Sequence, residues 1–224
     1  MISFFLPVFV IELTFLYFIS RLSIRELFYS LRIFFRSEKI VFAIVALIFF
    51  PGTVIHELSH FIVAMLLFLK VREIHIFPEF EKNYIKLGRV IYEKQDVIRG
   101  IIVGIAPIAI GLVIFFWMST LQIFFIENIW LKLLMLYLIF VISTTMFSSR
   151  QDLIDLGYLL PITIIIILFL YLFQIDLGRL LTNPQLIAVT TDFVYDVNVY
   201  LGISIAIHLG LLIFLFTVKK IFKS

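Results

Sequence analysis

Long apolar runs constrain the fold of this chain more than any other feature. An α-helix needs about 20 consecutive apolar residues to cross the hydrocarbon core of a bilayer. Six segments meet this condition, at residues 1–20, 40–69, 97–117, 129–147, 157–174 and 199–218. The sequence therefore predicts an all-α polytopic protein with about six transmembrane helices, located in the cell membrane as a multi-pass integral protein.

The composition excludes several classes of protein. Hydrophobic residues make up 63% of the 224 residues and charged residues only 15%, whereas soluble domains average about 45–50% and about 25%. A soluble chain of this size has no interior large enough to hide so much apolar surface. A soluble enzyme, a disordered chain and a nucleic-acid binder are therefore excluded. The basic residues fall in short blocks between apolar runs, as in loops that face lipid headgroups. We expect one domain over residues 1–224.

Two connecting segments carry structural signals. Arg21, Arg25, Arg32 and Arg36 share one helical face of residues 20–39, which favours either an interfacial amphipathic helix or a simple basic patch beside the membrane. Residues 71–94 are rich in β-branched and aromatic residues around the polar turn 81–83. This second pattern predicts a short membrane-associated β-hairpin after the second span.

The second span contains the residues with the clearest chemical meaning. It includes His56-Glu57-Leu58-Ser59-His60, after a Pro51-Gly52 pair that predicts a bend or a break. On a helix, side chains at positions i and i+4 lie on one face, so both imidazoles can bind one zinc ion. The intervening Glu57 can take a proton from a water molecule that zinc activates. The pattern predicts a zinc hydrolase.

The membrane context strengthens this interpretation. Ionisable side chains inside an apolar span are costly unless they face a polar cavity or coordinate a ligand. The alternative is a polar helix–helix contact without metal. A zinc hydrolase needs a third protein ligand, and without cysteine it must be His, Asp or Glu. Our choice is Asp152, at the end of the fourth span, ahead of Asp155; further candidates are Glu73, His75 and His208.

The chain resembles the site-2 protease family of intramembrane zinc metalloproteases. The resemblance covers about residues 40–160 and rests on the HELSH motif in an early span, the hairpin-like stretch after it, Gly104-Ile105-Ala106-Pro107 with Gly111 in the third span, and an Asp on a later span. It departs from the family at Ser59, where Gly is usual, and in the motif around the third ligand.

The resemblance implies a zinc ion held by His56, His60 and Asp152, with Glu57 as the general base. It also implies cleavage of a peptide bond in the transmembrane helix of a protein substrate, inside the bilayer. The cleaved segment must be extended, and it could add as a strand to the edge of the hairpin.

Other functions remain open at the level of sequence. A metal-cation transporter could use His and Asp inside its spans as a transit site, and a non-catalytic scaffold could bind membrane helices. A protease that uses Glu as third ligand is disfavoured, because no acid after His60 lies in an apolar helical run. For Glu12 in the first span and His208 in the last, we expect buried hydrogen bonds between spans.

Overall fold

The computed structural model describes residues 2–77, 79–81, 84–86, 88–93, 96–121, 123–147, 157, 163–164, 168, 172 and 184–223. Five helices dominate these residues: α1 (Ile2–Phe34), α2 (Glu38–Leu66), α3 (Val97–Thr120), α4 (Ile129–Thr145) and α8 (Pro184–Lys223). A single 3₁₀ turn, η1 (Ile123–Phe125), leads into α4. Four short strands lie between α2 and α3: β1 (Val71–His75), β2 (Glu79–Glu81), β3 (Tyr84–Lys86) and β4 (Arg89–Tyr92). The predicted mostly helical fold is present, with short antiparallel strands between α2 and α3.

The helices agree only in part with the six predicted spans. Among the described residues, α1, α2, α3 and α8 are long and apolar enough to cross a membrane, while α4 is shorter, with 17 residues. The predicted span at 157–174 lies almost wholly outside the described residues. A total of six spans is therefore not confirmed.

Two boundaries differ from the prediction. The segment 20–39 does not form a separate interfacial helix, because most of it continues the first span within α1. Helix α8 begins at residue 184 rather than near 199, with Pro184 in the first position, where its missing N–H costs nothing.

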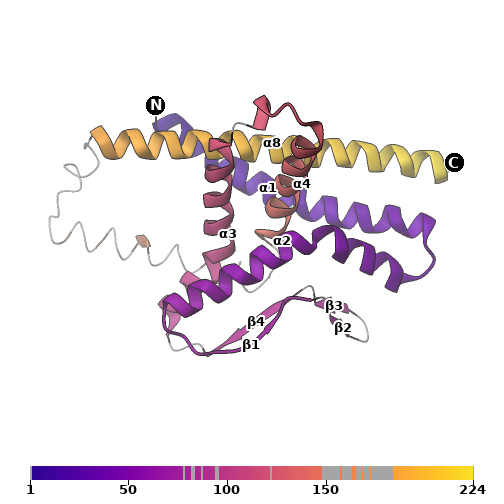
Figure 1. Cartoon of the computed structure of the whole chain (residues 1–224), viewed down its shortest axis with the longest axis horizontal. Helices are drawn as coiled ribbons and strands as arrows, with labels where there is room; N and C mark the ends of the chain where they lie inside the picture. The colour runs from indigo at the N-terminus through magenta and orange to yellow at the C-terminus, as the bar shows by residue number, and fades with distance from the viewer. Residues whose placement is uncertain are drawn as a thin grey trace.

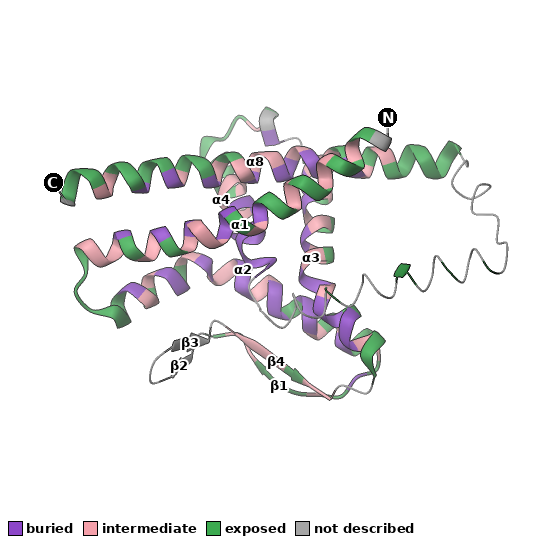
Figure 2. Ribbon diagram, turned by 180° about the vertical axis from the view of Figure 1, so that it is seen from behind, coloured by how far each residue is buried: buried purple, intermediate pink, exposed green. Residues whose placement is uncertain are grey.

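Helices α1 and α8 lie side by side along the longest dimension of the molecule (Figure 1). They run in the same direction, because Asn198 in α8 donates to the carbonyl of Phe5 near the start of α1, while Lys219, further along α8, pairs with Glu26, further along α1. Helices α3 and α4 cross between this pair and α2. Buried residues gather where the five helices meet (Figure 2), in a cluster that includes Leu16, Phe115, Ile139, Met146 and Leu201.

Polar residues join helices inside this packed region. Nδ1 of His208, on α8, lies 2.9 Å from the hydroxyl of Ser23 on α1, and His208 is fully buried. The hydroxyls of Ser143 and Thr144, on α4, lie within 3.5 Å of its Nε2. The expected interhelical hydrogen bond of His208 is therefore present.

The hairpin packs beside α2. Strand β1 pairs antiparallel with β4, and β2 pairs with β3, so the outer and inner parts of the hairpin are separate two-stranded pieces. The ring of Phe77, just after β1, stacks on Phe50 of α2 with centroids 5.6 Å apart. This packing brings the start of β4 close to the middle of α2.

Helix α2 is continuous through Pro51, so the chain is not broken there. Figure 1 shows that the helix instead changes direction along its length, which is the bend that an internal proline produces. The hydroxyl of Tyr137, on α4, donates to the carbonyl of Ile48 at 2.7 Å. This hydrogen bond joins α2 to α4 in the turn before Pro51.

Candidate metal centre

Helix α2 places His56, Glu57 and His60 in the interior. Their exposed fractions are 3%, 7% and 8%. Three ionisable side chains buried within five residues are costly unless each has a polar partner or a ligand. The site lies on the part of α2 that packs against both α3 and α4.

The Nε2 atoms of the two imidazoles face each other. Nε2 of His60 lies 3.2 Å from Nε2 of His56, and the ring planes are nearly perpendicular, at 87°. Two nitrogens on one tetrahedral zinc, each about 2.0–2.1 Å from the metal, lie about 3.3–3.4 Å apart. The two rings are thus at hydrogen-bond distance, and the same spacing is close to that of two ligands of a single zinc ion.

A backbone carbonyl on α3 fixes the orientation of His60. Nδ1 of His60 lies 2.8 Å from the carbonyl oxygen of Val103. A carbonyl only accepts, so Nδ1 carries the proton and donates it, and the lone pair of the neutral ring is on Nε2. Metal-binding histidines commonly use the second ring nitrogen in this way.

The sequence of α3 explains why this carbonyl is available. In an α-helix the carbonyl of Val103 would accept from the N–H of residue 107. Residue 107 is a proline, which has no N–H, and it lies inside α3. Pro107 therefore leaves the Val103 carbonyl without its helical donor, and His60 takes that place.

Gly88 allows the hairpin to approach the Glu57 side chain. A Cβ atom added at Gly88 would lie 2.7 Å from Cγ and 3.0 Å from Oε1 of Glu57. Real side chains essentially never come so close, so any other residue here would have to displace the carboxylate. The backbone just before β4 thus forms one wall of the Glu57 environment.

Helix α4 supports the site from another side. A Cβ atom added at Gly52, one turn before His56, would lie 2.5 Å from the carbonyl oxygen of Val141 and 2.6 Å from Oγ1 of Thr145. The backbones of α2 and α4 are therefore in direct contact. Thr145 and Met146 also line a small pocket beside His56, together with Pro107.

The predicted third ligand lies outside the part of the chain that the structure describes. Asp152 and Asp155 both lie outside the described residues, five and eight positions beyond Phe147. Within the described part of the chain, no group of three His, Asp or Glu side chains converges as a metal site. His75 and Glu73 pair with each other on β1 at 3.2 Å, and His208 binds Ser23.

Two contacts of the site were not predicted from the sequence. The glycines and the proline of the third span were predicted to allow close packing, and Gly100, Gly104, Pro107 and Gly111 are indeed buried, but the role of the Val103 carbonyl was missed. Gly88 was missed as well. A glycine inside a strand-like run is a signal of close backbone approach, and it was available in the sequence.

No protein-family model, curated protein or solved structure matches this chain. Its function is therefore inferred from its own residues and their geometry.

Proposed function

We propose that this chain is an intramembrane zinc endopeptidase, a multi-pass protein of the cell membrane that cleaves the transmembrane helices of protein substrates. The observation that carries the proposal is the histidine pair: two buried Nε2 atoms 3.2 Å apart, with Nδ1 of His60 bound to a carbonyl. The 3.2 Å separation is also that of a hydrogen bond between the two rings. What favours a metal site over a polar contact is the combination of this spacing, burial in an apolar span and the acceptor that orients His60.

In this proposal His56, His60 and Asp152 hold the zinc ion, in the ligand set of a hydrolase with one open position. Bound zinc would act as a Lewis acid on the scissile carbonyl and on the attacking water. Asp152 is proposed on the sequence alone, as the acid that follows α4 most closely.

Glu57 is the general base. It lies between the two histidines in sequence, is 7% exposed, and contacts Gly88 of the hairpin. Its carboxylate takes a proton from the attacking water and then delivers that proton to the amide nitrogen that leaves. The products are a new carboxylate and a new amine, so one water molecule is consumed for each peptide bond.

The hairpin supplies a surface for the substrate backbone. A helix hides its peptide bonds, so the cleaved segment must be extended before water can attack it. Strand β4 begins next to Gly88, which touches Glu57, and its partner in the described sheet is β1. A substrate strand added along β4 would lie beside the proposed base. Prolines at successive positions of Val71–His75 and Arg89–Tyr92 should lower cleavage; a scan without effect would exclude strand addition.

The test uses purified protein in lipid nanodiscs. Zinc content and cleavage of a panel of single-span proteins are measured for the wild type, His56→Ala, His60→Ala and the control His75→Ala. We expect one zinc per chain, lost in the first two variants and kept in the control, with cleavage following zinc. Zinc binding without cleavage, together with transport of the ion into vesicles, would favour a cation transporter.

Single Ala substitutions of Asp152 and Asp155 assign the third ligand. We expect Asp152→Ala to lose zinc and Asp155→Ala to keep it. The opposite pattern would move the assignment to Asp155 and leave the reaction class unchanged.

A further inference from the structure

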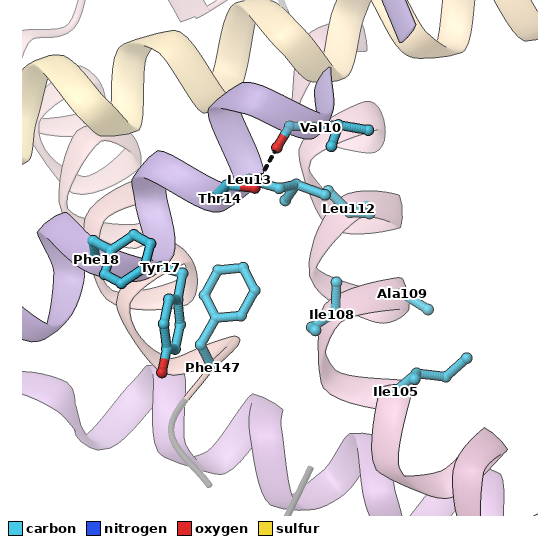
Figure 3. A pocket seen from close by; sticks show the side chains of 10 residues that line it. All are labelled: Val10, Leu13, Thr14, Tyr17, Phe18, Ile105, Ile108, Ala109, Leu112 and Phe147. Carbon is cyan, nitrogen blue, oxygen red and sulfur yellow. Dashed lines mark hydrogen bonds between the residues drawn. The ribbon is translucent and has the colours of Figure 1, made fainter. Parts of the chain in front are cut away.

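An apolar groove separates α1 from α3. It has a volume of about 530 Å³ and is lined on one side by residues of α1 and on the other by residues of α3, with Phe147 after α4 (Figure 3). The lining residues that matter here are Tyr17, Phe18, Ile108, Ala109 and Phe147. The size is within the range of about 300–1,000 Å³ that small-molecule sites have.

The volume favours a slender occupant over a protein helix. A helix about 10 Å across fills about 120 Å³ per residue, so a groove of about 530 Å³ would hold only about four residues. A transmembrane helix is several times longer. A single hydrocarbon chain is narrower than a helix, so it suits a space of this size better.

A cation lies beside one of the residues that line the groove. The guanidinium carbon of Arg21 lies 4.8 Å from the centre of the Tyr17 ring, and Tyr17 lines the groove. The Tyr17 ring also meets Phe147 edge-on, with centroids 5.8 Å apart. Arg21 is therefore held against a side chain that lines the apolar space.

Arg21 has one buried donor that lacks an acceptor among the described residues. Its Nε atom is buried, and no described residue accepts a hydrogen bond from it. A guanidinium has five N–H donors in a planar fork that matches the oxygens of a phosphate or carboxylate. Leaving a buried charged donor without an acceptor is costly, so this geometry calls for an anion from outside the chain.

We propose that the groove between α1 and α3 binds an anionic phospholipid of the surrounding membrane, with one acyl chain in the groove and its phosphate on Arg21. Both requirements of such a ligand are met by neighbouring residues: an apolar groove, and beside its Tyr17 a cation with a buried N–H that no described residue accepts. This site does not depend on the proposed peptidase activity.

The test counts lipids on the purified, delipidated protein by native mass spectrometry. Phosphatidylglycerol and phosphatidylcholine with the same acyl chains are titrated separately. We expect tighter binding of phosphatidylglycerol, and a loss of about tenfold in its affinity for Arg21→Gln. Arg25→Gln is the matched control, since Arg25 lies one turn further along α1 and its side chain is 62% exposed; it should bind as the wild type does.

A second variant tests the groove itself. Ala109→Phe fills the space from α3 and should weaken both lipids, while its elution volume and helical circular dichroism stay those of the wild type. Equal binding of the two lipids by the wild type, or no effect of Arg21→Gln, would overturn the proposal. Displacement of the lipid by a neutral single-span peptide would assign the groove to a protein helix instead.

Discussion

Nδ1 of His60 donates to the carbonyl oxygen of Val103 across 2.8 Å, and Pro107 is the residue that leaves this carbonyl available. Pro107 has no N–H to donate to this carbonyl. Helix α3 can therefore use the carbonyl to orient a side chain of α2. The orientation of a proposed zinc ligand on α2 therefore depends on a proline in α3.

Pro107→Ala should weaken zinc binding without weakening the fold. The new N–H at position 107 competes with His60 for the Val103 carbonyl, and loss of such an outer partner costs about 10–100-fold in metal affinity. Alanine is the better helix former by about 3 kcal/mol, so the thermal midpoint should not fall. Zinc affinity by competition with a chelator measures the first effect. Pro7→Ala, in α1, is the control; equal zinc affinity in all three proteins would refute the role of Pro107.

Gly88→Ala should lower cleavage and keep zinc. The added methyl group would lie 2.7 Å from Cγ of Glu57, so the carboxylate has to move, and a small misplacement of a catalytic group can cost about 100-fold. The measurement is kcat on a single-span substrate beside zinc content. Gly210→Ala is the matched control, because a Cβ there meets nothing within 4 Å. Full activity of Gly88→Ala would show that the hairpin does not restrain Glu57.

Gly52→Ala should destabilise the contact between α2 and α4. Its Cβ would lie 2.5 Å from the backbone oxygen of Val141, and a backbone atom cannot turn away as a side chain can. Forcing an extra carbon into such a contact costs about 1–3 kcal/mol. Thermal unfolding in nanodiscs should show a lower midpoint than for the wild type and for Gly210→Ala. An unchanged midpoint would mean that the two helices separate without cost.

The ion pair between Glu26 and Lys219 should couple α1 to α8. The two side chains are 10% and 18% exposed, and removing one partner of a buried pair costs about 3–5 kcal/mol because the other charge stays behind. Glu26→Gln and Lys219→Met should each destabilise the protein, and the double variant should be less unstable than the sum of the two. Additive effects in this double-mutant cycle would show that the charges do not interact.

The local part of the site could be predicted because it lies within one helix. His56 and His60 are four residues apart, so helical geometry alone puts their side chains together. Val103 and Gly88 come from other elements, and their contacts depend on how α3 and the hairpin pack on α2. Such contacts leave only indirect traces in a sequence, here a proline four residues after a carbonyl and a glycine within a strand-like run.

The end of the first helix also depends on contacts that the sequence alone does not reveal. The charges after residue 20 predicted an end of the span, yet α1 continues to Phe34. The reason is tertiary: Ser23 and Glu26 are buried and bind His208 and Lys219 of α8. In the sequence these polar residues look like the end of a membrane span. In the structure they join α1 to α8, two helices that are far apart in the chain.

Strands after the second helix were predicted from their β-branched and aromatic residues, and β1 does pair antiparallel with β4 there. Division of the hairpin into outer and inner strand pairs was not predicted. Its contact with the bilayer stays a prediction.

The most direct test of the central claim is the cleavage rate of Glu57→Gln at unchanged zinc content. Glutamine keeps the size of the side chain and removes the base, and a positioned general base contributes about 10²–10⁴-fold. We expect the variant to bind zinc as the wild type does, and to cleave single-span substrates at least about 100 times more slowly. Equal cleavage by the two zinc-loaded proteins would contradict the account.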